Sequence, residues 1–382
     1  MALFDSIHLT LLIGPSLPLP APPTLMEALQ SVEITQRDEG SSGFQIAFSL
    51  SRGTLLDVLD YTMLLGPQLK PFSRVIVMVT VNGIPGLLID GVITHRQHKP
   101  DTEPGDALVT ITGEDVSVMM DLQEKRTVHP ALPDFAIATK LILSYPQYGM
   151  IPNVIPPVVS DPPLPMQRVP TQQGTDLQML RLLASRNGFV FFVSPGPAPL
   201  TNTAYFGPPP RIGLPQPALA IGLGRNSNVS KLDFAYNALS GATIDDSVED
   251  SLSGATLPVK TFAGTRLPPF AFNPGVSPLN TTRTLLADTC SGIDIVQAFG
   301  RAQARTDVST DAIVTATGEL DVLRYGRTLS ARGTVGVRGA GFTHDGLYYV
   351  KQVTHKISRE SYTQSFTLTR EGEGSLLPAV PP

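Results

Sequence analysis

Proline and glycine divide this chain into short units, because they cluster at places where a long helix or a central strand cannot continue. The 382 residues include 36 prolines and 33 glycines. The prolines gather at residues 14–23, 151–165, 206–217 and 267–278. Proline lacks a backbone donor and restricts the residue before it, so these clusters favour extended, semi-rigid connections. We interpret them as joints between folded units.

The first unit has the pattern of an antiparallel β-structure. Residues 43–51 (GFQIAFSLS) carry apolar side chains at every second position, which is typical of a strand with one buried face. Residues 73–97 predict two strands around Asn82-Gly83, a dipeptide that accepts the positive φ angles of a tight turn. Residues 107–115 add an alternating strand, followed by a short helix or turn. We therefore predict a small antiparallel β-barrel over residues 1–127.

The second unit mixes helix and strand. Residues 135–149 contain helix formers with apolar side chains on one face, up to a break at Pro146. Thr175 and Gln178 have the spacing of a capping box and begin a helix that ends before Gly188, where an apolar strand follows. We predict an α+β insert over residues 128–222.

The third unit repeats the first in outline. Strands are predicted at residues 228–237 and 311–322, with a helix within residues 292–308 between them and a hairpin at residues 347–372 after them. We predict a second antiparallel β-barrel over residues 223–382, ending in a proline-rich tail. The predicted fold is thus mainly β, with two small antiparallel β-barrels joined by an α+β middle domain.

The closing hairpin reads as two alternating runs around a four-residue loop, residues 358–361. Its apolar side chains are expected to seal the second barrel, with one strand facing the other. On that pattern we place His355 at an end or rim of the barrel. The side chains expected in the seal are Tyr349, Val353, Ile357, Phe366 and Leu368.

Charge and composition exclude several classes of protein. The formal net charge of −5 provides no basic field for nucleic acid, and no apolar run is long enough to span a bilayer. We expect neither nucleic-acid binding nor direct membrane insertion. Cys290 is the single cysteine, so an intramolecular disulfide and a cysteine zinc cluster are excluded. The apolar N-terminus has no Lys or Arg before it and carries Asp5, so it is interpreted as a strand rather than a signal peptide.

Residue types that carry chemistry are scattered. His95 and His98 are three residues apart and would point to opposite faces of a strand, which does not suit a metal pair. We interpret the histidines as surface polar residues; they are His8, His95, His98, His129, His344 and His355. An acidic group lacks the glycine and the spacing of a calcium loop and is interpreted as a solvated loop; it comprises Asp245, Asp246, Glu249 and Asp250.

Glycine-rich stretches at residues 221–228 and 336–342 lack the spacing of phosphate loops and are predicted to be turns. The sequence has no nucleophile elbow, zinc-protease helix or Cys-His constellation. We therefore predict no catalytic, cofactor-binding or metal-binding residues, and a protein that is not an enzyme. Paired carboxylates of a glycosidase would meet only in three dimensions, so this class stays open as an alternative.

The order of the segments resembles the baseplate hub proteins of contractile tails, the phage late control D family, over nearly the whole chain. These proteins are related to the N-terminal part of type VI valine-glycine-repeat spike proteins. The signal lies in the order of the segments rather than in one motif. The segments are VEITQRDEGSSGFQIAFSLS, LIDGVITHRQ, VTITGEDVSVMMDL, TDLQMLRLLASRNGFVFFV and LYYVKQVTHKISRESYTQSFTLTREG.

The resemblance implies that the two barrels are of tail-tube type. It also implies a homotrimeric hub that matches a hexameric inner tube to a trimeric spike. Its expected partners are tube or tube-initiator proteins, other baseplate proteins and a spike, which we expect to be a separate chain because none follows EGEGSLLPAVPP. The hub would be assembled in the bacterial cytoplasm and become part of a phage tail or injection-system baseplate. A baseplate-associated peptidoglycan-cleaving enzyme and a ligand-binding β-protein remain the alternatives.

Overall fold

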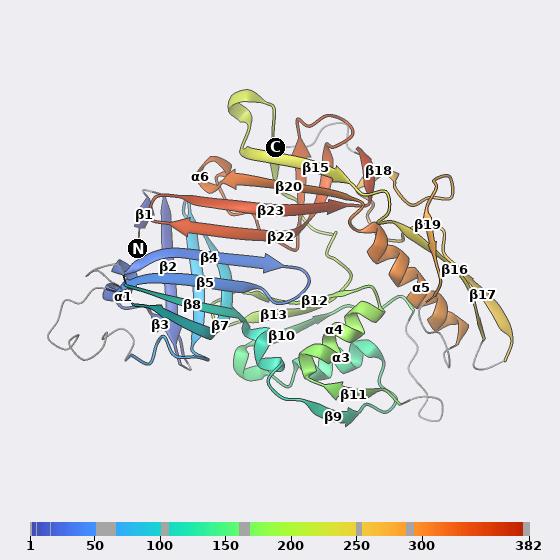
Figure 1. Cartoon of the computed structure of the whole chain (residues 1–382), viewed down its shortest axis with the longest axis horizontal. Helices are drawn as coiled ribbons and strands as arrows, with labels where there is room; N and C mark the ends of the chain where they lie inside the picture. The colour runs from blue at the N-terminus through green and yellow to red at the C-terminus, as the bar shows by residue number, and fades with distance from the viewer. Residues whose placement is uncertain are drawn as a thin grey trace.

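The protein is described by a computed structural model and is mainly β (Figure 1). The described residues are 2–4, 6–15, 17–50, 66–100, 107–159, 169–249, 254–287 and 294–376. Asp5, Asp250, Cys290 and the proline-rich tail after residue 376 lie outside these ranges. Within them, no helix has the length and apolar character needed to cross a membrane.

One sheet of 14 strands dominates the molecule and contains strands from both ends of the chain. Its main path runs β1-β2-β6-β7-β8-β5-β4-β22-β23-β20-β15, with β3 beside β2, β21 beside β22, and β14 beside β21. Figure 1 shows the blue strands β4 and β5 next to the red strands β22 and β23. The bounds are β1 Ala2–Phe4, β2 Ile7–Gly14, β3 Leu19–Pro20, β4 Leu29–Arg37, β5 Gly43–Leu50, β6 Arg74–Val81, β7 Ile84–Lys99, β8 Ala107–Asp115, β14 Gln216–Ala220, β15 Val229–Tyr236, β20 Val314–Asp321, β21 Thr334–Arg338, β22 Gly346–Ser358 and β23 Tyr362–Arg370.

The two-barrel arrangement is not confirmed, because the strands predicted to form separate barrels share this one sheet. Antiparallel pairing of β4 with β22, from Ser31↔Ser358 to Arg37↔Gln352, carries the sheet from the first half of the chain into the second. No closed barrel is found among the described residues. The division into three domains, residues 1–127, 128–222 and 223–382, stays a prediction.

Local sequence explains why the strands form where they do. In β5, Phe44, Ile46 and Phe48 are each at most 2% exposed while the residues between them are wetter, which confirms the predicted alternation. The turn between β6 and β7 is Asn82-Gly83, with φ angles of 50° and 80°. Apolar side chains from both halves of the sheet pack into one large core.

The two halves of the sheet share one strand order, so the predicted repeat is confirmed at this level. In the first half the order is β4-β5-β8-β7-β6, and in the second it is β15-β20-β23-β22-β21. Every neighbouring pair in both series is antiparallel.

A bulge in the closing hairpin corrects the predicted seal. The pairing of β22 with β23 shifts register between Val350 and Gln352. The bulge offsets the alternation of side chains by one residue, so even-numbered residues before it lie on the same face as odd-numbered residues after it. Val350 therefore joins the core with Val353, whereas Tyr349 lies outside that core and lines a small cavity beside Asp38. The other four predicted side chains of the seal are in the core.

The middle of the chain packs around a second, separate core. The capping box of α4 is confirmed, with Thr175 Oγ1 accepting from the Gln178 amide at 3.2 Å. Helix α3 ends at Ile142, earlier than predicted, because Tyr145 before Pro146 leaves the helical region (φ −122°, ψ 49°). The elements are η2 Val116–Met120, β9 Lys125–Val128, α3 Asp134–Ile142, η3 Pro146–Tyr148, β10 Met150–Val154, β11 Thr171–Gly174, α4 Asp176–Arg186, β12 Val190–Pro195 and β13 Asn202–Gly207.

The second half carries an arm in which helix α5 packs against strands β16 and β17, as Figure 1 shows. Asp294 caps α5 through a 2.8 Å bond from the Gln297 amide. The arm comprises β16 Ala242–Glu249, β17 Thr256–Lys260, β19 Arg283–Leu285 and α5 Ile295–Thr310. The remaining elements are α1 Pro23–Glu27, η4 Gly224–Asn226, β18 Ala271–Pro274, α6 Val322–Tyr325 and β24 Gly372–Ser375.

Candidate assembly interface

The residues considered for chemistry lie apart from one another. His95 and His98 are exposed on β7 and His8 is exposed on β2, as expected for surface histidines. His129 is 1% exposed, with its Nε2 3.3 Å from Gln172 Oε1, so the surface interpretation is wrong for this residue. In the part of the chain that the structure describes, no three His, Cys, Asp or Glu side chains could hold a metal ion.

His355 is also buried, and its predicted place at a barrel rim is wrong. The side chain is 1% exposed on the core face of β22, with Nδ1 2.8 Å from Tyr362 Oη and 3.2 Å from Gln364 Nε2. Burial lowers the pKa of His355 to about 3, so the imidazole is neutral at physiological pH. It is a structural polar group within the core.

Asp245, Asp246 and Glu249 lie on strand β16 and not in a loop, which corrects the sequence interpretation for these three residues of the acidic group. Asp245 pairs with Lys260 at 3.0 Å, and Asp246 accepts from the Ala287 amide at 2.9 Å. These carboxylates therefore connect β16 to its neighbours. The glycine-rich stretch at residues 221–228 forms a turn as predicted, with positive φ angles at Gly222 and Gly224. The stretch at residues 336–342 does so only from Gly339 onward, because residues 336–338 belong to strand β21.

Three arginine-centred joints fix the middle of the chain on the sheet. The first is a buried ion pair between Arg74 on β6 and Asp90 on β7, with two 2.7 Å hydrogen bonds. Asn202 on β13 donates to Asp90 at 3.0 Å, and Arg74 also donates to the Tyr148 and Leu200 carbonyls. Because both charges are buried and multiply bonded, the joint holds β13 in one position relative to β6 and β7.

The second joint is built by Arg332, just before β21. Its guanidinium donates to Ser42 Oγ, to the Arg37 carbonyl at 2.7 Å and to the Val193 carbonyl at 2.8 Å. The group also lies over the Phe192 ring, 4.3 Å from its centroid. One side chain thus connects β4, β12 and the start of β21.

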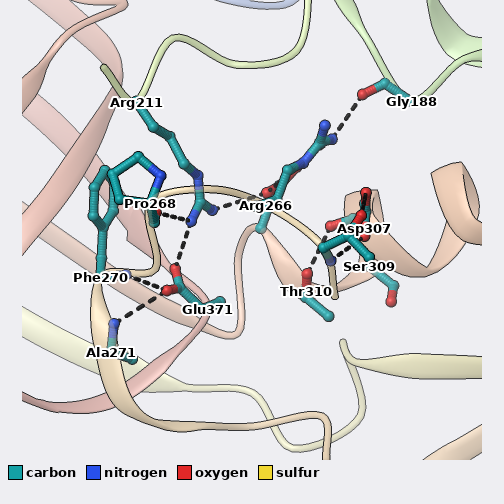
Figure 2. Close-up of polar contacts among 12 residues, drawn as sticks. Gly188, Arg211, Arg266, Pro268, Phe270, Ala271, Asp307, Ser309, Thr310 and Glu371 are labelled. Atoms are coloured by element: carbon teal, nitrogen blue, oxygen red, sulfur yellow. Dashed lines mark hydrogen bonds and ion pairs between the residues drawn. The ribbon is translucent and has the colours of Figure 1, made fainter. Parts of the chain in front are cut away.

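The third joint lies where the middle of the chain meets the arm (Figure 2). Arg211 donates to Glu371 at 3.0 Å and to Asp311 at 3.0 Å. Arg266 donates to Asp311 at 2.9 Å and to the Gly188 carbonyl at 2.7 Å. Five segments that are distant in sequence are therefore held together by charge-assisted bonds.

The carboxylate of Glu371 extends this third joint. It accepts from the backbone amides of Phe270 and Ala271, the latter at 3.1 Å, as Figure 2 shows. Asp307 on α5 accepts from the Thr265 amide at 2.7 Å, which ties the following segment to the helix. Such closely bonded charges favour a fixed geometry between the sheet, the middle of the chain and the arm.

Sequence reasoning missed these joints. Arg74 at the start of an apolar strand and Arg211 after three prolines were the available signals, since a charge in such surroundings is buried only when it is paired. The partners are distant along the chain, and a single sequence does not pair them.

A cleft of about 950 Å³ lies between the middle of the chain and α5. Prolines at residues 208–210 and apolar side chains such as Ile212, Leu267 and Phe299 line it. Two charged residues at its wall, Arg186 and Asp134, lie 3.6 Å from each other. The walls therefore present a mainly apolar surface.

The sheet also has edges at which strand pairing stops. Among the described strands, β15 pairs with β20 alone. Pairing of β7 with β6 ends at Val92, whereas β7 continues beside β8 to Lys99. Side chains of residues 94–99 are exposed. An open strand edge is a template for pairing with another chain.

No model of a known protein family matches the chain, and no curated protein matches it. Solved structures of tail proteins match it along nearly its whole length. A tail protein from Neisseria meningitidis MC58 is 14% identical, with a TM-score of 0.60 over 97% of this chain and 98% of that chain. The 43 kDa tail protein of prophage MuSo2 from Shewanella oneidensis is 12% identical, with a TM-score of 0.61 over 96% and 99%.

An E. coli protein described as a component of the type VI secretion system, with structural similarity to the bacteriophage T4 tail proteins gp27 and gp5, is 14% identical. Its TM-score is 0.57, over 93% of this chain and 77% of that chain. Identities this low relate the chains by fold. The chain therefore has the mainly β fold of phage tail proteins.

Proposed function

We propose that the protein is a structural baseplate hub of a phage tail or a contractile injection system, without catalytic activity of its own. Three copies form a ring that connects a hexameric inner tube to a trimeric spike. The ring assembles in the bacterial cytoplasm with tube, spike and other baseplate proteins. The late control D resemblance and the fold of the tail-protein neighbours both support this role.

The observation that carries the proposal is the repeated strand order within one chain. Two equivalent units per chain give six units in a ring of three chains, which is the number a hexameric tube presents. Closed rings need a fixed angle between units, because an angular error at each contact prevents closure. The three arginine joints supply such rigidity.

Mass measurement by light scattering after size exclusion tests the proposal. The protein, alone or with its spike partner, is expected to elute as a species of three copies. A chain that stays monomeric at high concentration, with the spike present, would overturn it. Zymography on peptidoglycan tests the absence of catalysis, and a lytic band abolished by replacing one Asp or Glu would favour the enzyme alternative instead.

The cleft is the observation that favours the second candidate, a ligand-binding β-protein. Its volume of about 950 Å³ suits a small molecule. However, the polar groups of Arg266 and Asp311 beside it bond to each other and to the backbone, so they serve the third joint. We therefore place the structural role first.

A further inference from the structure

The two halves of the sheet correspond strand by strand, and two of their register shifts fall at equivalent positions. The strand β7 shifts register against β8 between Ile93 and His95, and β22 shifts against β23 between Val350 and Gln352. When these two bulges are superposed, His95 corresponds to Gln352. Bulges re-aim a strand at one defined point, so a shared bulge indicates a shared local structure.

A second bulge agrees with this correspondence. Pairing of β4 with β5 shifts between Leu29 and Ser31, and pairing of β15 with β20 shifts between Val229 and Lys231. The residue pairs can be traced across the sheet from β7 through β8 and β5 to β4, and likewise from β22 through β23 and β20 to β15. If His95 and Gln352 are equivalent, this tracing makes Ser31 equivalent to Lys231. The bulges on β4 and β15 thus coincide.

A strained backbone position is repeated as well. Phe72 and Arg332 both have positive φ angles, 65° and 68°. The Phe72 amide donates to the Ile93 carbonyl at 2.7 Å, and the Arg332 amide donates to the Val350 carbonyl at 2.8 Å. Ile93 and Val350 both directly precede a bulge. The β6-to-β7 region is therefore equivalent to the β21-to-β22 region.

The repeat predicts a contact that is made once within the chain and that no described strand makes at the equivalent place. Strand β4 pairs with residues 352–358 of β22. The equivalent of β4 is β15, and the equivalent of this part of β22 is the end of β7, from residue 95 to Lys99. Among the described strands, neither of these has a partner on the corresponding side.

We propose that β15 of one copy pairs antiparallel with the end of β7 in the next copy, in the register of the internal β4-to-β22 contact. Gln97 then lies opposite Ala235, and Lys99 lies opposite Asp233. The contact is head to tail, so each copy contributes one edge of each kind and the copies close into a ring. The inference rests on the proposed ring and names the strands that join its copies.

Charge and burial at the two contacts are complementary in the same way. Within the chain, Lys356 lies opposite Glu33, which the Lys99 and Asp233 pair reproduces in sign. Val32 and Ile34 on β4 are 2% and 0% exposed where β22 covers their strand. Their equivalents on β15, Leu232 and Phe234, pack against the core but are only half-buried. A strand added beside β15 would complete their burial.

Cysteine cross-linking of the full-length protein tests the register. In a Cys290→Ser background, Gln97→Cys and Ala235→Cys are combined in one chain and oxidised. Thr35 and Thr354 provide the matching internal pair, since their hydroxyl oxygens lie 3.1 Å apart and cysteines there should link within one chain. The control for register is Gln97→Cys with Lys231→Cys, four residues further along β15.

For Gln97→Cys with Ala235→Cys, the expected result on non-reducing gels is a series of cross-linked species that ends at a covalent trimer. The register control and Thr35→Cys with Thr354→Cys are expected to run as monomers. The mass of the reduced protein is measured in parallel. Three copies without a cross-link, or with equal cross-linking in the shifted pair, would overturn the strand pairing while the proposed ring stands. Monomer throughout would overturn both.

Charge reversal provides a second test that does not depend on disulfide geometry. Lys99→Glu is expected to lower the association constant about two- to fivefold for each contact, because like charges then face each other across the ladder. Adding Asp233→Lys should restore it, and Lys356→Glu with Glu33→Lys serves as the internal comparison. Loss of association that the second substitution fails to restore would contradict the pairing.

Discussion

Strands β4 and β15 occupy equivalent places in the two halves of the sheet, yet their surroundings differ. β4 lies between β5 and β22, and its apolar face is fully buried. β15 is the last described strand of its half, and its apolar face is partly wet. The same local design thus serves as an interior junction in one place and as an open edge in the other. In the proposed ring, another copy completes the second contact.

The largest effect is expected deep in the core next to the interior junction. Phe366 is 3% exposed and lies opposite Val353 and Gly318. Phe366→Ala should lower the free energy of unfolding by about 3 to 5 kcal/mol through the cavity it leaves. Phe234→Ala at the open edge should cost less in the isolated chain but reduce trimer yield. Urea unfolding and mass measurement separate the two, and equal costs of unfolding would contradict the comparison.

The buried ion pair of the interior should contribute more to the free energy of unfolding than the exposed ion pair on β15. Asp90→Ala leaves the buried Arg74 without its carboxylate and should cost about 3 to 5 kcal/mol. Asp233 pairs with Lys231 at 2.8 Å on the exposed face of β15, so Asp233→Ala should leave the unfolding of the isolated chain unchanged. Thermal unfolding of both variants checks this, and a large shift for Asp233→Ala would break the distinction.

His355 gives the interior a pH dependence. Its pKa is lowered to about 3 in the folded chain, below its ordinary value of 6.5, so the unfolded chain binds more protons between these two values. The stability that neutral His355 contributes should be fully present above pH 6.5. The free energy of unfolding should then fall on acidification, by on the order of 3 kcal/mol between pH 7 and pH 4. His355→Gln should flatten this fall in urea titrations. An unchanged pH dependence of the free energy of unfolding would show that another group takes up the proton.

A smaller effect of opposite sign is expected at Asp38, near the end of β4. Burial raises the pKa of Asp38 to about 6 from 3.8, although Lys351 opposes the shift. The folded chain therefore holds this proton more tightly, and stability should fall as pH rises from about 4 to 6. Asp38→Asn is expected to stabilise the protein at pH 7 by about 1 to 2 kcal/mol. Destabilisation at pH 7 would show that the carboxylate serves a bonding role.

Much of the local structure could be predicted from the sequence, because its signals lie within a few residues. The Asn82-Gly83 turn, the Thr175 cap and the closing hairpin are of this kind. The single sheet could not be predicted in this way, because β4 and β22 pair across more than 300 residues of chain. The prediction that Tyr349 faces the core was wrong, because a bulge at one residue reverses the alternation without a sequence signal.

The candidate interface, too, could be predicted from the sequence only in part. Exposed histidines on β7 were expected, but the significance of that stretch became visible only when both halves of the sheet were aligned by their bulges. The arginine joints depend on charges that meet from distant segments. Alternation and composition describe one strand at a time, whereas these features belong to pairs of strands.

Hydrogen exchange of the backbone amides, followed by mass spectrometry before and after ring assembly, tests the central claim most directly. The account predicts that amides of β15 and of the end of β7 become protected on assembly, whereas amides of β4 and β22 are already protected in the single chain. Assembly into a three-copy ring with β15 still exchanging at its single-chain rate would contradict the account.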